Sequence, residues 1–138
     1  MTINSKVKGD IAEAAVIAAF LRAGFNVLIP FGDRNRYDIV LERDGKFQRI
    51  QIKTARIARG CLAFNTCSNT RRNGERISTC YTGQIEAFAV YYPITDSIYF
   101  VPVETVPTRT AYLRLDRSFV AKHCRYADDF IFTAHKSL

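Results

Sequence analysis

Four polar side chains within the first 53 residues have the types needed for metal-assisted hydrolysis of a phosphate ester: Glu13, Asp38, Gln51 and Lys53. Two carboxylates and an amide supply the oxygen ligands that Mg²⁺ prefers. A cation held in this way neutralises a phosphate and lowers the pKa of an attacking water. A lysine ammonium is a compact charge that can orient the water or stabilise the negative charge that develops.

The segment 37–53 is predicted to form one β-hairpin. Asp44-Gly45 is a strong signal for a two-residue type I′ turn, because both central residues of that turn need positive φ. Pairing of Arg43 with Lys46 across the turn would then set the register of every further pair.

This register brings the polar residues together. It places Asp38 opposite Gln51, and Arg36 opposite Lys53. Side chains alternate along a strand, so Asp38, Gln51 and Lys53 share one face. Opposed Cβ atoms are about 4.5–5.5 Å apart, which is close enough for these groups to meet one ion and one phosphate. The other face is expected to enter the core through four residues: Ile39, Leu41, Ile50 and Ile52.

Asp38 is the first candidate ligand for a Mg²⁺ or Mn²⁺ ion at this site. Glu13 would complete the pocket through the ion or a bound water, the backbone carbonyl of Ile52 points sideways from its strand, and Gln51 has one neutral oxygen to offer. Taken alone, a single glutamate such as Glu13 is more simply interpreted as a solvated helix residue.

The elements that must position these residues follow from apolar spacing and breakers. Residues 5–23 are predicted to form a helix, capped by Asn4 or Ser5 and ended by Gly24. Its apolar stripe is expected to contain Val7, Ile11, Ala14, Ala15, Ala18 and Leu21.

Strands are expected at 25–30, 37–43, 46–54, 97–103 and 112–115. Residues 60–80 read as a second, exposed hairpin or loop, and 84–92 as a helix or turn entering a buried strand. In 117–133, Phe119, Val120 and His123 suggest a helical turn, and 130–132 a strand. This order of elements predicts an α/β core with a mixed β-sheet flanked by helices.

Length and composition indicate one domain over residues 1–138, with 48% hydrophobic and 24% charged residues. No run approaches the roughly 18 apolar residues that a membrane span requires. The N-terminal residues carry no export signal, so a cytoplasmic, DNA-associated location without membrane contact is expected.

The net charge of +7 favours a polyanionic partner, nucleic acid above all, although a basic solvated surface is the alternative on charge alone. Arginines cluster in and beyond the predicted hairpin, where bidentate phosphate contacts would suit them. The candidate DNA contacts are Lys6, Lys8, Arg34, Arg36, Arg49, Arg56, Arg59, Arg71, Arg72 and Arg76.

The four cysteines contain no Cys-x-x-Cys pair, and without an export signal reduced thiols are expected. Small, partly buried apolar residues are the favoured interpretation. A zinc site would need Cys61, Cys67 and Cys80 with His123 or Cys124, a spacing that matches no zinc template.

Three segments, 8–13, 33–38 and 51–55, together resemble the PD-(D/E)XK nuclease superfamily. Within it, the chain is most similar to the small group containing a cyanobacterial group I intron-encoded homing endonuclease; archaeal Holliday-junction resolvases look like more distant relatives. The resemblance covers residues 6–56 well and the strands at 88–103 loosely. It implies a PD-(D/E)XK restriction-endonuclease-like core whose catalytic residues are Glu13, Asp38, Gln51 and Lys53.

The resemblance further implies a Mg²⁺-dependent endodeoxyribonuclease that acts on double-stranded DNA as a homo-oligomer, a dimer or a tetramer. Sequence readout is then expected in residues 57–80. Most superfamily members have Asp or Glu where this chain has Gln51, which removes one negative charge from the metal site. A homing endonuclease is the leading hypothesis; a Holliday-junction resolvase and a non-catalytic DNA-binding protein on the same fold are the alternatives.

Overall fold

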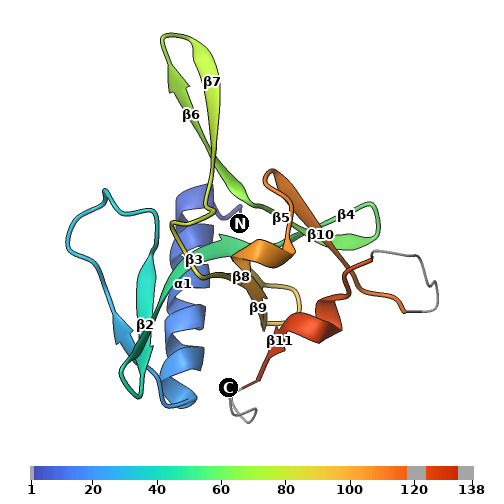
Figure 1. Ribbon diagram of the computed structural model, residues 1–138. Coiled ribbons are helices and arrows are strands. Elements are labelled where there is room, and N and C mark those ends of the chain that lie inside the picture. Colours follow the sequence, from blue (N-terminus) through green and yellow to red (C-terminus); the bar gives the residue numbers. More distant parts are fainter. Residues whose placement is uncertain (1, 118–123, 134–138) are drawn as a thin grey trace.

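The computed structural model describes residues 2–117 and 124–133, which build a six-stranded mixed sheet, one α-helix and two smaller sheets (Figure 1). Neighbouring strands of the large sheet are antiparallel except β3 and β8, which run parallel. In spatial order these strands are β1 (Asn26–Leu28), β2 (Ile39–Arg43), β3 (Lys46–Thr54), β8 (Ala87–Tyr92), β9 (Ser97–Pro102) and β11 (Ile131–Phe132).

The predicted N-terminal helix and both of its ends are confirmed. Helix α1 spans Ser5–Arg22, and the side chain of Asn4 caps it by accepting the Val7 N–H at 2.9 Å. Gly24 follows with φ +91°, a conformation that glycine adopts without a steric cost.

The predicted apolar stripe was wrong, because the buried face of the helix lies on nearly the opposite side. The buried side chains are Ala12, Val16 and Phe20. Alanine and other apolar residues occur around much of the helix circumference, so apolar spacing alone allows more than one stripe. The large ring of Phe20, fully buried against Phe25, decides between them. Of the predicted stripe, Val7, Ile11 and Leu21 stay 42–54% exposed, Ala14 is exposed, and Ala15 and Ala18 are half-buried.

Strands β2 and β3 form the predicted hairpin, here called the site hairpin. Arg43 pairs with Lys46, and the turn residues Asp44 and Gly45 have φ of +52° and +77°. The predicted inward face is confirmed, with exposures of 9% or less for Ile39, Leu41, Ile50 and Ile52.

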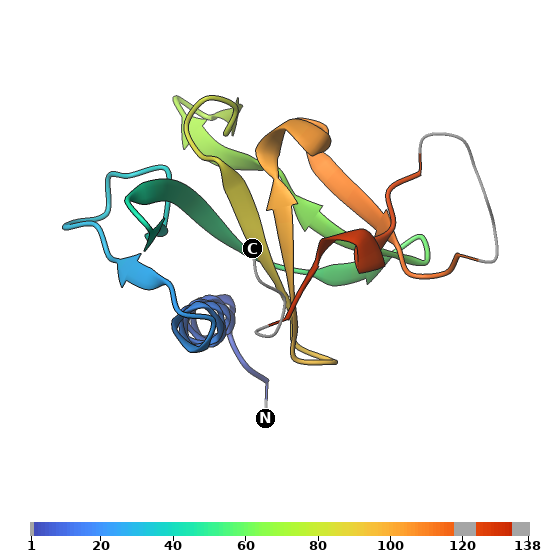
Figure 2. The ribbon, with the colours of Figure 1, turned by 60° about the horizontal axis from the view of Figure 1, so that its bottom comes forward.

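A second sheet covers the face of the large sheet opposite α1, where the sequence led us to expect helices (Figure 2). It consists of β4 (Arg56–Ala58), β5 (Cys61–Asn65) and β10 (Thr110–Arg114), the last being the edge strand expected near 112–115. Strand β8 is therefore buried on both sides: Ala87, Ala89 and Tyr91 pack in the cluster with α1, and Phe88 and Val90 in the other. A continuous apolar run is typical of such a strand.

The exposed hairpin expected within 60–80 is formed by β6 (Cys67–Arg72) and β7 (Glu75–Cys80), here called the outer hairpin. It projects from the body of the molecule as a two-stranded ribbon (Figure 1). Every residue from 69 to 80 is exposed. The remainder of the 60–80 segment, β5, is instead buried in the second sheet.

The chain after β9 forms two short 3₁₀ helices, η1 (Val103–Thr105) and η2 (Ala127–Phe130). Strand β11 at 131–132 confirms the strand expected there. The helical turn suggested by Phe119, Val120 and His123 lies outside the described residues. Among the described helices, none has both the length and the apolar character to cross a bilayer.

Candidate active site

Asp38 lies where β2 separates from β3. The paired register ends at Ile39 and Ile50, and the Asp38 N–H donates to the Ile50 carbonyl at 2.9 Å. If the register continued, Asp38 would lie opposite Gln51. The bond to the Ile50 carbonyl instead places Asp38 one residue away from that position. Its Oδ2 accepts the Ile52 N–H at 2.9 Å, so the carboxylate takes the place of a partner-strand carbonyl.

Helix α1 brings Glu13 to the same place. Two adjoining cavities, of about 290 and 240 Å³, share only Glu13 and Asp38 among their lining residues. Gln51 and Ile52 line the first cavity, whereas the loop at 29–37 lines the second. The structure thus gathers two carboxylates, an amide and a strand backbone around one open space.

The pKa values of both carboxyl groups are raised, mainly by burial. Burial raises the pKa of Glu13, and the charges of Asp38 and Asp10 raise it further. Burial also raises the pKa of Asp38, while its bond from the Ile52 N–H and the nearby Lys53 ammonium oppose the shift. A divalent cation between the carboxylates would relieve the burial and repulsion that destabilise their charged forms.

Ile52 points its backbone toward the same space. Its N–H is bonded to Asp38, on the side away from β8, and in a strand the N–H and C=O of one residue point to the same side. The Ile52 carbonyl is therefore directed toward the edge that carries Asp38, as predicted for a metal ligand.

Lys53 extends on the face of β3 opposite Ile52. Its Nζ lies 3.4 Å from the hydroxyl oxygen of Tyr81 and 5.0 Å from the centre of that ring. It is close enough to Asp38 to act on the pKa of that carboxyl. Asp38, Gln51 and Lys53 thus surround the end of the site hairpin, although Lys53 lines neither of the two cavities.

The donor set fits a hard cation bound by few carboxylates. In the part of the chain that the structure describes, no group of three His, Cys, Asp or Glu side chains could hold a metal. Glu13 and Asp38 would hold the ion, with neutral oxygens from Gln51 and Ile52 as further ligands. Cys61, Cys67 and Cys80 form no such group there, and His123 of the zinc alternative is outside the described residues.

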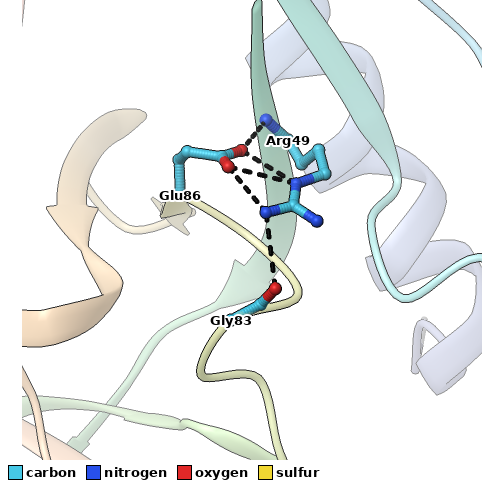
Figure 3. A network of polar contacts seen from close by, with 3 residues as sticks. All are labelled: Arg49, Gly83 and Glu86. Carbon is cyan, nitrogen blue, oxygen red and sulfur yellow. Dashed lines mark hydrogen bonds and ion pairs between the residues drawn. The ribbon is translucent and has the colours of Figure 1, made fainter.

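Two of the predicted DNA contacts are bound within the protein. Arg49 reaches from β3 to Glu86 (Figure 3). Its Nη2 lies 2.7 Å from Oε1 of Glu86 and also donates to the Gly83 carbonyl. The Arg49 guanidinium lowers the pKa of Glu86. This pair ties β3 to the segment that leads into β8.

Arg36 is the second. The predicted position opposite Lys53 does not occur, because the site-hairpin ladder has already ended at Ile39. The guanidinium instead bonds to Gln84 and to the base of the outer hairpin, where it contacts Ser68 and the carbonyls of Thr79 and Cys80.

The other predicted DNA contacts are solvent-exposed: Lys6, Lys8, Arg34, Arg56, Arg59, Arg71, Arg72 and Arg76. Lys6 and Lys8 lie on the first turns of α1, and Arg34 on the loop beside the second cavity. Arg71, Arg72 and Arg76 flank the tip of the outer hairpin, and within the described ranges none of these three takes part in an ion pair.

Sequence reasoning did not single out Tyr81 or Glu86. Glu86 had a signal, because it is the only charged residue in the apolar run 85–92 and a half-buried acid there needs a partner. Tyr81 had none, since its contacts with Arg36 and Lys53 join three segments far apart in the sequence.

Residues 3–133 match the PD-(D/E)XK endonuclease family, so the chain belongs to this family and has its mixed α/β fold. The structure is similar to that of a bacterial homing endonuclease, I-Ssp6803I, with a TM-score of 0.79 and 23% identity, covering 94% of this chain and 89% of that one. Protein 5.3 of Escherichia phage T7 is 38% identical over 47 residues, which are 34% of this chain and 40% of the phage protein. The match therefore spans less than half of that relative.

Proposed function

We propose that the protein is a divalent-metal-dependent endonuclease that hydrolyses phosphodiester bonds of double-stranded DNA, with Mg²⁺ or Mn²⁺ as its cofactor. The observation that carries this proposal is the convergence of Glu13 and Asp38 on one open space beside Lys53. Membership of an endonuclease family supports the reaction class.

The residues have separate roles in the proposed reaction. Glu13 and Asp38 would hold the cation, with the Ile52 carbonyl and the Gln51 amide oxygen as further ligands. A divalent cation held there would supply positive charge beside the phosphate and would make the attacking water more acidic. Lys53 supplies a positive charge next to the reacting phosphate, where negative charge develops. With Gln51 in place of a carboxylate, the site has one negative charge fewer and is expected to bind Mg²⁺ more weakly.

The outer hairpin is the proposed DNA-reading element. A two-stranded ribbon fits the major groove of B-form DNA, and three arginines at its tip suit phosphates and guanine edges. One domain with one site cuts one strand, so double-strand cleavage requires at least a dimer. The similarity to a homing endonuclease favours a sequence-specific enzyme of that kind over a junction resolvase.

The decisive experiment compares nicking and binding of DNA by site variants and matched controls. Asp38→Ala and Lys53→Ala are each expected to lower the Mg²⁺-dependent single-turnover rate by roughly 100- to 1,000-fold while DNA affinity without metal is retained. Glu104→Gln and Lys46→Ala, which remove an exposed negative and an exposed positive charge away from the site, should cleave normally.

Each alternative predicts a different result. Unchanged cleavage by either site variant would reject the assigned site. DNA binding by the native protein without any cleavage would favour the non-catalytic alternative. A preference for four-way junctions over every long duplex in a substrate panel would favour the resolvase.

A further inference from the structure

Tyr81 contacts two cationic side chains, those of Arg36 and Lys53. It follows directly after β7, its ring is 4% exposed, and it packs edge-on against Phe88 with ring centres 5.5 Å apart. The Arg36 guanidinium carbon is 4.0 Å from the ring centre, and the Lys53 ammonium is 5.0 Å from it. The hydroxyl oxygen, 3.4 Å from Nζ of Lys53, can accept a hydrogen bond from it.

Arg36 fixes this tyrosine to the outer hairpin. Its Nη1 donates to Ser68 on β6, and its Nη2 to the backbone carbonyls of Thr79 and Cys80 on β7, at 3.0 and 3.1 Å. Nε donates to Gln84 in the turn after Tyr81. All three nitrogens of the guanidinium are thus engaged, so its geometry suits a structural clamp better than a phosphate contact.

Lys53 depends on neighbours of this kind for its position. Within the described residues, no carboxylate lies within ion-pair distance of its Nζ. A lysine side chain has many rotamers, so its ammonium stays in one place only when other groups restrict it. The Tyr81 hydroxyl oxygen and the electron-rich face of its ring provide this restriction.

We propose that Tyr81 is a positioning residue that holds the ammonium of Lys53 in the site, and that Arg36 connects it to the outer hairpin. This inference rests on the proposed function and adds a physical link between DNA engagement and cleavage. Movement of the hairpin base on DNA would move Arg36 and Tyr81, and with them the cation at the reacting phosphate.

The test compares Tyr81→Phe with Tyr91→Phe. Both variants remove one hydroxyl from a buried tyrosine, but the Tyr91 hydroxyl bonds to Asp96 at the β8–β9 turn, away from the site. At saturating DNA, Tyr81→Phe is expected to lower the single-turnover rate roughly tenfold, because this corresponds to the contribution of one hydrogen bond to a charged group. DNA affinity and thermal stability should stay within the range of the Tyr91→Phe control.

A rate equal to that of the wild type would overturn the inference. A rate loss accompanied by an equal loss of DNA affinity, or by a larger drop in melting temperature than the control shows, would also overturn it. That pattern is expected if the role of Tyr81 is purely structural.

A second measurement needs no cleavage, so it separates failure of this inference from failure of the proposed function. The acetylation rate of Lys53, followed by mass spectrometry of the free protein, is expected to rise roughly threefold or more in Tyr81→Phe and in Arg36→Lys. It should not change in Tyr91→Phe. If the wild type cleaves no DNA, the proposed function fails; an unchanged Lys53 reactivity rejects the positioning role whether or not DNA is cut.

Discussion

The site hairpin and the outer hairpin reverse through the same kind of turn and meet different surroundings. Asp44-Gly45 and Asn73-Gly74 all have φ between +52° and +78°. Beyond the turn, the site hairpin joins the large sheet, with β1 beside β2 and β8 beside β3, and buries Ile39 and Ile50 completely. Among the described residues, no third strand joins the outer hairpin, and all its residues from 69 onward are exposed.

This difference suits the two hairpins to different roles, one to holding the site residues and the other to contacting a ligand. Neighbouring strands and a buried face fix the register of the site hairpin, so the carboxylate at its end is held in place. A two-stranded ribbon by itself is marginally stable and can adapt to a ligand surface. Substitutions in the first hairpin should therefore affect stability and chemistry, and substitutions in the second should affect DNA binding.

The largest expected effect comes from one substitution made in both hairpins. Ile50 is fully buried, so Ile50→Ala should lower the free energy of unfolding by about 2–5 kcal/mol. Ile77, 39% exposed on β7, should lose less than about 1 kcal/mol. Urea denaturation of both variants measures the difference, and similar losses would mean that the outer hairpin is packed against something in the native protein.

The next effect concerns DNA affinity. Removal of two phosphate contacts in Arg71→Ala/Arg72→Ala should lower the slope of log affinity against log salt by about 2, and the affinity at about 0.15 M salt roughly 30-fold. Arg43→Ala/Lys46→Ala, the matching pair beside the site-hairpin turn, should leave the slope unchanged. Titration of labelled duplex at several salt concentrations tests this, and equal slopes in all proteins would exclude the outer hairpin as a phosphate-binding element.

A smaller effect is expected at the turns. No atom lies within 4 Å of a Cβ added at Gly45 or Gly74, so Gly→Ala costs only the strain of positive φ, about 1–2 kcal/mol. Gly45→Ala should lower the global free energy of unfolding by this amount. Gly74→Ala should leave it almost unchanged, because the outer hairpin can open without unfolding the core. Equal losses would show that the two hairpins unfold as one unit.

The smallest effect is a dependence of stability on pH. Because burial raises the pKa of Asp38, the folded state binds the proton more tightly than the unfolded state, and this contribution is lost as pH rises through the folded pKa. In metal-free buffer, Asp38→Asn should therefore become increasingly stable relative to wild type as pH rises from about 4 through the raised pKa of folded Asp38, and the difference should level off above it. Added Mg²⁺ should stabilise only the wild type. Melting curves with EDTA or Mg²⁺ measure both differences, and a constant gap across pH would contradict the raised pKa.

Sequence reasoning worked where structure is decided locally. The Asp44-Gly45 turn set the register of the site hairpin, and Asn4 and Gly24 marked the helix ends. It failed for the second sheet, because β5 pairs with a strand more than forty residues further along the chain. Local patterns contain no information about such partners.

The same limit applies to charged residues. An arginine that binds phosphate and one that clamps a hairpin look alike in a sequence. Arg36 and Arg49 are used internally only because Gln84 and Glu86 arrive beside them in the folded chain. Side-chain partners from distant segments, as with Tyr81, are visible only in the structure.

The hydrogen bond from the Ile52 N–H to Asp38 matters when the sequences of related proteins are compared. The Asp38 carboxylate accepts a backbone hydrogen bond at the end of the sheet. Its loss would leave a strand N–H without a partner even in a protein that does not cut DNA. The Glu13 carboxylate accepts no hydrogen bond within the described residues, so folding alone does not preserve it. A relative that has lost cleavage is expected to keep the aspartate longer than the glutamate, which makes Glu13 the better marker of a working enzyme.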